Sequence, residues 1–118
     1  MNDTVSFLYE VAVKPGQVNE LRTLMSVLVD SAQTEPGALV YEWSLSDDKS
    51  VAHVEERYAD STATLSHLAK FRESFLPRFL AAVEPRRLVV YGTPSDKVKE
   101  ALKTTNPVYM SAFEGFAR

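Results

Sequence analysis

The spacing of the apolar residues changes along the chain, and this change restricts the fold more than any other feature. From Thr4 to Val13 apolar and polar side chains alternate, which is the period of a β-strand. From Gln17 the apolar residues recur every three or four positions, as on one face of a helix, until Pro36 and Gly37 end the pattern. The sequence therefore predicts a strand followed by an amphipathic helix.

The same two periods recur through the rest of the chain. The further predicted elements are strands at 38–45 and 51–58, a helix over 61–83, a strand at 86–92, a helix at 95–103 and a strand at 107–113. Polar residues between the second and third strands indicate an antiparallel hairpin. Pro77 removes a backbone donor within the second helix, which predicts a kink or two abutting helices.

The element order is β-α-β-β-α-β with a trailing α-β. Its first six elements match the split βαβ, ferredoxin-like arrangement, an α+β fold with an antiparallel sheet and helices on one face. A chain of 118 residues fits a single domain, and no internal repeat or low-complexity linker divides it.

Apolar residues lie on both faces of this predicted sheet. In the first strand Leu8 and Ala12 oppose the set that contains Tyr9, and in the second strand Val40 opposes Tyr41. Helices on one face leave the other uncovered, and a large uncovered apolar patch normally marks association. We therefore expect a homodimer formed through the open sheet face.

Composition excludes several classes of function. A net charge of −3 without a Lys/Arg cluster argues against a nucleic-acid partner. The absence of cysteine excludes disulfides and thiolate chemistry. No apolar run approaches the ~18 residues of a membrane span, and the N-terminus has no basic and apolar leader. We expect no membrane partner and a cytoplasmic location.

Three stretches of the sequence, VKPGQVNELRTLM, EPGALVYEW and EERYADSTATLSHL, together resemble the antibiotic biosynthesis monooxygenase domain family. The resemblance implies a dimeric α/β-barrel of ferredoxin-like protomers, with residues 1–118 as one domain. It covers a core of about 5–83 and leaves a C-terminal β-α-β extension at about 86–118. It further implies an oxygenase without a cofactor, whose substrate, a small aromatic phenol or quinol, is deprotonated in a dry cavity and reduces O₂ itself.

Two histidines are candidates for the base that such chemistry needs. His67 lies beside Phe71 at the edge of the apolar stripe of the second helix, where an imidazole would reach a pocket and accept a phenolic proton. The alternative is a half-exposed histidine bonded to water or to Glu56. His53 shares a strand face with charged residues, which favours a solvated or dimer-edge position.

Glu56 is the second catalytic candidate, as the group that orients the histidine or the substrate hydroxyl. Glu56 and Glu42 each share a strand face with apolar residues, where a carboxylate needs a partner. The favoured alternative is an ion pair with an arginine elsewhere, such as Arg72 or Arg86. The two histidines lack metal-ligand spacing, so no metal site is expected.

Four strand aromatics are candidates for substrate binding: Trp43, Tyr58, Tyr9 and Tyr41. Such rings most often fill a core or a dimer interface, but they would also form a stacking wall for a planar substrate. The functional alternatives to an oxygenase are a non-catalytic dimeric barrel that binds a ligand or serves a stress response, and an isomerase or lyase on the same fold.

Overall fold

A computed structural model of the protein describes residues 3–118. Its elements are β1 (Val5–Val13), α1 (Val18–Gln33), β2 (Ala38–Leu45), β3 (Val51–Tyr58), α2 (Ser61–Ser74), α3 (Leu76–Ala82), β4 (Val83–Gly92), α4 (Asp96–Leu102), the 3₁₀ helix η1 (Lys103–Thr105) and β5 (Val108–Met110). The strand order β2-β3-β1-β4 is antiparallel throughout, and β5 adds to β4 in parallel. The predicted ferredoxin-like α+β fold is confirmed, as a five-stranded mixed sheet that is not closed into a barrel.

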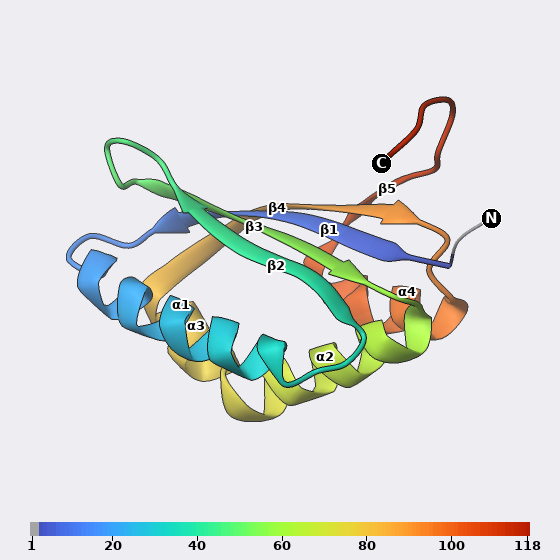
Figure 1. Ribbon diagram of the computed structural model, residues 1–118. Helices are drawn as coiled ribbons and strands as arrows, with labels where there is room; N and C mark the ends of the chain where they lie inside the picture. Colours follow the sequence, from blue (N-terminus) through green and yellow to red (C-terminus); the bar gives the residue numbers. More distant parts are fainter. Residues whose placement is uncertain (1–2) are drawn as a thin grey trace.

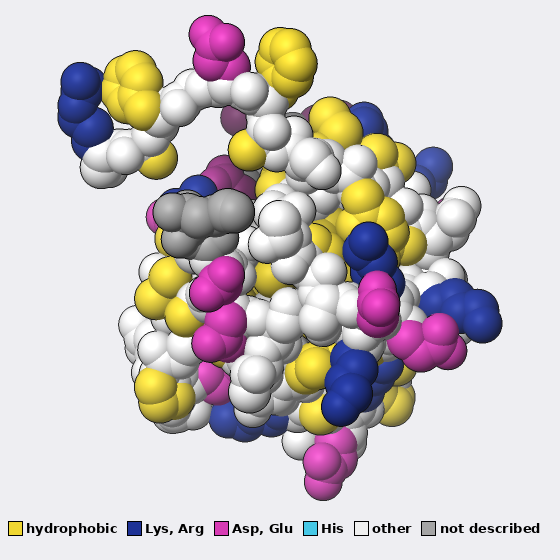
Figure 2. Space-filling view, turned by 90° about the vertical axis from the view of Figure 1, so that its right-hand side faces the viewer, with side chains coloured by type: hydrophobic (Ala, Val, Ile, Leu, Met, Phe, Trp, Pro, Cys, Tyr) yellow, Lys and Arg dark blue, Asp and Glu magenta, His cyan; other side chains and the backbone are white. Residues whose placement is uncertain are grey.

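The four α-helices lie on one face of the sheet, and the C-terminal segment leaves the sheet on the opposite face (Figure 1). Figure 2 shows this last segment standing clear of the body, and the exposed side chains of Phe113 and Phe116 belong to it. No helix within residues 3–118 is both long and apolar enough to cross a membrane.

Two clusters of buried side chains form the core on the helix side of the sheet. β1 buries Val5, Phe7 and Val11 on the helix side. α1 packs against this side with one stripe of fully buried residues: Leu21, Leu24, Leu28 and Ala32.

Pro77 separates two helices, as predicted. It occupies the first turn of α3, where a missing N–H costs no hydrogen bond. The predicted helix end was wrong by one residue, because Val83 is extended (φ −137°, ψ 162°) and begins β4.

The second strand differs from its predicted pattern at one position. A bulge between Ala38 and Val40 shifts the register, so that Ala38 lies opposite Tyr58. Ala38 consequently packs on the helix side, and Leu39, predicted to share a face with Tyr41, is 54% exposed.

Candidate functional site

A cavity of about 460 Å³ lies between the helix side of the sheet and helices α2 and α3. This volume is within the range of small-molecule sites. Its walls include six aromatic side chains: Phe7, Tyr9, Tyr41, Trp43, Phe71 and Phe79. Phe71 was predicted to belong to the core; it is half-buried and forms part of the cavity wall without filling it.

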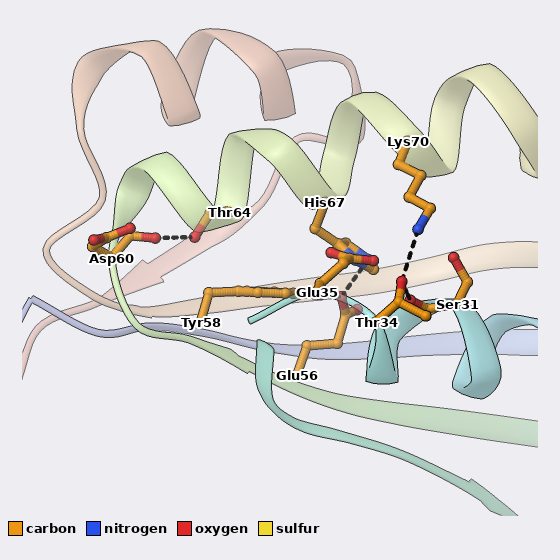
Figure 3. Close-up of polar contacts among 9 residues, drawn as sticks. All are labelled: Ser31, Thr34, Glu35, Glu56, Tyr58, Asp60, Thr64, His67 and Lys70. Atoms are coloured by element: carbon orange, nitrogen blue, oxygen red, sulfur yellow. Dashed lines mark hydrogen bonds and ion pairs between the residues drawn. The ribbon is translucent and has the colours of Figure 1, made fainter. Parts of the chain in front are cut away.

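His67 and Glu56 are the polar groups at the inner end of this cavity. His67 is 7% exposed and lies between two carboxylates, which Figure 3 shows reaching it from different elements. Its Nδ1 is 3.0 Å from Oε1 of Glu35, and its Nε2 is 3.3 Å from Oε1 of Glu56. Both contacts are satisfied together when the ring is protonated and donates from both nitrogens.

The carboxylates determine the charge of this imidazole. Burial by itself lowers the pKa of His67, but the hydrogen bonds and negative charges of Glu56 and Glu35 outweigh it and raise the pKa above its ordinary value. His67 is therefore protonated over a wider pH range than a free histidine.

The first prediction concerns this titration. Only two histidines occur in the chain, so NMR spectra of wild type and His53→Gln assign both imidazole signals. We expect the titration midpoint of His67 to lie above 6.5. A pKa raised by folding stabilises the protein fully below about pH 6.5, and this contribution disappears as the pH rises through the folded pKa. A midpoint below 6.5 would contradict the ion pairs.

Tyr58 fixes the second carboxylate. Its hydroxyl donates to Oε1 of Glu56 at 2.5 Å, and its ring centroid is 4.9 Å from that of His67. Burial and the neighbouring charge of Glu56 raise the pKa of Tyr58, so its phenol remains a donor. Tyr58 has 0% exposure and is not part of the cavity wall, so its position differs from that of a substrate-stacking ring.

Glu35, the other carboxylate, was not among the predicted site residues. It lies in the connection between α1 and β2, where its carbonyl accepts from the N–H of Ala38 at 3.0 Å. The amine of Lys70 donates to the Thr34 hydroxyl at 3.2 Å, which joins the same connection to α2 a second time (Figure 3). The sequence feature that could have identified Glu35 is its position directly before Pro36-Gly37, because the chain reverses there and brings Glu35 to the sheet edge.

The three remaining aromatic candidates, Tyr9, Tyr41 and Trp43, all line the cavity. Burial and then the charge of Glu56 raise the pKa of Tyr41 and of Tyr9, and the neighbouring Trp43 opposes this slightly at Tyr41. The indole Nε1 of Trp43 is buried and meets no acceptor in good geometry within residues 3–118. The Trp43 ring packs edge-on against Phe79, with centroids 6.2 Å apart.

Other predicted positions lie outside the site. His53 bonds to Glu10 at 2.9 Å on the open face and is about 41% exposed, consistent with a solvated or dimer-edge position. Glu42 is exposed. The predicted ion pair of Glu56 with an arginine was wrong: Arg86 lies 3.9 Å from Glu84, and Arg72 donates to the Ala101 carbonyl.

The C-terminal extension forms part of the site. Leu102 packs into the core beneath the sheet, and Thr104 and Thr105 of η1 line the cavity together with residues of α2 and β4. Among the described residues, no group of three or more His, Cys, Asp or Glu is arranged to hold a metal ion.

Comparison with known proteins gives the family. The model of the antibiotic biosynthesis monooxygenase family matches residues 4–85, more than half of the chain. The chain belongs to this family. No curated protein matches the sequence.

Solved structures similar to this chain share its fold. MupZ from Pseudomonas fluorescens has 22% identity and a TM-score of 0.89, covering 99% of this chain and 96% of its own. SnoaB from Streptomyces nogalater, a cofactor-independent oxygenase, has 18% identity and a TM-score of 0.64, covering 79% and 95%. A putative antibiotic biosynthesis monooxygenase from Nitrosomonas europaea has 17% identity and a TM-score of 0.66, covering 79% and 92%.

Proposed function

We propose that the protein is a cofactor-independent monooxygenase that acts on a small aromatic phenol or quinol. The observation that carries the proposal is a cavity with aromatic walls in which a buried carboxylate, Glu56, is held by an imidazolium and a phenol. The family supports oxygenase chemistry, and SnoaB is described as an oxygenase of this kind.

The geometry supports Glu56 as the group that accepts the substrate proton. Both nitrogens of His67 already face carboxylates, and Tyr58 and His67 both contact Oε1 of Glu56. No other described residue bonds to Oε2, so this oxygen is available to accept the proton of a substrate hydroxyl. His67 is then the anchor that holds the carboxylate and offsets its charge, rather than the proton acceptor itself.

The reaction balances without another electron donor. A quinol and O₂ give a hydroxyquinone and water: one oxygen atom replaces a ring hydrogen as a hydroxyl, and the other leaves as water. The ring supplies all four electrons, and its anion, formed when Glu56 accepts a proton, begins the reduction of O₂. The apolar walls around Trp43 and Phe79 exclude water from this step.

The second prediction is the direct test of this function. Oxygen uptake is measured with a panel of naphthalene-, anthracene- and benzene-derived quinols, each corrected for autoxidation. We expect at least one to be consumed with formation of the hydroxylated quinone, and His67→Ala and Trp43→Ala each to reduce the rate about tenfold or more. Consumption equal in wild type and both variants would remove the catalytic proposal.

The same proton-transfer group also supports an isomerase or lyase, because Glu56 and His67 need no O₂ to move a proton within a substrate. The discriminating measurement is turnover under nitrogen. A monooxygenase stops when O₂ is removed, whereas an isomerase or lyase continues at the same rate. A ligand-binding protein without activity would bind an aromatic compound and transform none in either atmosphere.

We further propose that the open sheet face forms a homodimer. Helices cover only one face of the sheet (Figure 1), and the open face carries a hollow in which Leu8, Val40 and Tyr91 lie among polar residues: Ser6, Glu42, Glu55 and Arg57. Apolar side chains gathered on an uncovered face are typical of association surfaces. A second copy of this chain offers the matching surface by two-fold symmetry.

The third prediction tests this dimer. Sedimentation at micromolar concentration should give a dimer for wild type and a monomer for Leu8→Glu, because burying an unpaired carboxylate in the interface is costly. Thr62→Glu, at an exposed position on the helix side, is the control and should remain dimeric. A monomeric wild type would contradict the dimer.

A further inference from the structure

The cavity has two chemically different ends. Glu56 and His67 line its inner end, between β3 and α2. Arg72 of α2, Arg86 and Arg87 of β4, and Thr104 and Thr105 of η1 also line it, so that cationic and hydroxyl groups accompany the apolar walls. The chain as a whole is acidic, with a net charge of −3, so this group is not part of a general basic surface.

A bulge in β4 explains how an arginine reaches the cavity. Glu10 of β1 lies opposite Arg87, but the next residue, Val11, lies opposite Pro85, so that Arg86 is the extra residue of β4. In such a bulge two successive side chains turn to one face of the sheet, and bulges are common beside binding sites because they redirect a side chain. Arg86 lines the cavity, as does its neighbour Arg87.

Arg86 has no strong partner of its own. Its nearest carboxylate is Glu84 at 3.9 Å, and both side chains are more than half exposed, so this pair is worth little. The hydroxyl of Thr104 makes no hydrogen bond within residues 3–118, whereas Arg72 donates to the Ala101 carbonyl and holds α4 against α2. Arg86 and Thr104 therefore have donors that no strong partner occupies among the described residues.

The spacing between the two ends suits one extended ligand. In the sheet register Glu56 lies opposite Phe7, and the bulge that contains Arg86 begins beside Glu10, three residues further along β1. Three residues of strand correspond to about 10 Å. Fused aromatic rings between Trp43 and Phe79 would fill this length, leaving a substituent at the far end beside Arg86.

We propose that Arg86 and Thr104 bind an anionic group, a carboxylate or a phosphate, at the end of the aromatic substrate remote from Glu56. Arginine pairs with both anions through two parallel N–H donors, and the hydroxyl supplies a third. This inference rests on the proposed function, because it assumes that the aromatic substrate binds in this cavity. It narrows the substrate class to aromatic compounds with an acidic substituent. Because η1 supplies Thr104, the C-terminal extension becomes a determinant of specificity.

The test compares three probes that share one ring system. Calorimetric titration of the full chain with 2-naphthoate, 2-naphthyl phosphate and the neutral 2-naphthylmethanol measures the preference for charge. We expect at least one anion to bind about tenfold more tightly than the alcohol in low salt. Arg86→Gln should remove that preference while changing the affinity for the alcohol less than twofold. Arg78→Gln, on the exposed surface of α3, is the matched control and should retain the preference.

The relative affinities of the two anions identify the group that the site prefers. A preference below threefold in wild type, a preference that survives Arg86→Gln, or failure of all three probes to bind would overturn the inference. The protein could show a charge preference that depends on Arg86 and yet consume no O₂ with any quinol. That result would support this binding site and contradict the oxygenase proposal. The two proposals therefore fail in distinguishable ways.

Discussion

Replacing Glu56 by glutamine is expected to reduce oxygen uptake about a thousandfold with the quinol that wild type consumes fastest. The amide keeps the shape of the side chain and still accepts the hydrogen bond from Tyr58, but it takes no proton from a substrate hydroxyl. Saturating substrate should not restore the rate, because the change affects the chemical step rather than binding.

An exposed glutamate of α2 provides the control for this substitution. Glu73 lines neither the cavity nor the open-face hollow, so Glu73→Gln makes the same chemical change outside both sites. It should leave oxygen uptake within about twofold of wild type. Thermal unfolding of both variants shows whether Glu56→Gln is folded. A folded Glu56→Gln variant with wild-type turnover would exclude Glu56 as the base.

Much of the site was predictable because periodicity assigns side chains to faces. Alternation grouped Tyr9 and Tyr41 each with the apolar residues on one face of its strand, and helical spacing placed His67 beside Phe71; all four line the cavity. These predictions depend only on local geometry, which fixes where a side chain points once the element is known.

Partners that meet only in the folded chain were not predictable in this way. Glu35 and His67 are 32 positions apart and come together because the connection after α1 lies against α2. The pairing of Glu56 with His67 instead of an arginine has the same origin. The buried residues of α2 include Thr64 and His67, which are polar. The spacing of the hydrophobic residues therefore did not predict how completely His67 is buried.

Tyr58 and the extension illustrate two further limits. Alternation grouped Tyr58 with Val54 and Glu56 on one face of β3, but exposure to the cavity depends on what packs against the ring, and residues of several elements bury Tyr58 completely. The role of η1 depends on how residues beyond the family core return to the sheet, which the family resemblance does not describe.

Gly37→Ala is expected to disturb both stability and activity, because Gly37 packs against the helix that carries His67. A Cβ at Gly37 would lie 2.4 Å from Cβ of Ala63 in the first turn of α2. Neither Cβ moves without its backbone, so α2 and the connection that holds Glu35 must separate. We expect a loss of about 1–3 kcal/mol in the free energy of unfolding. Displacement of His67 from Glu35 should lower turnover about tenfold or more.

A second substitution across the same contact separates this steric cause from a general effect of alanine at Gly37. Ala63→Gly removes the methyl group that the new Cβ would meet, at a cost of about 0.5–1 kcal/mol for glycine in a helix. The double variant Gly37→Ala/Ala63→Gly should therefore be more stable than Gly37→Ala alone, recover most of its oxygen uptake, and show a favourable coupling energy in the mutant cycle. Additive losses would mean that the backbone conformation at position 37, rather than the contact with α2, requires glycine. They would also contradict the inference that the contact between Gly37 and Ala63 holds Glu35 against His67.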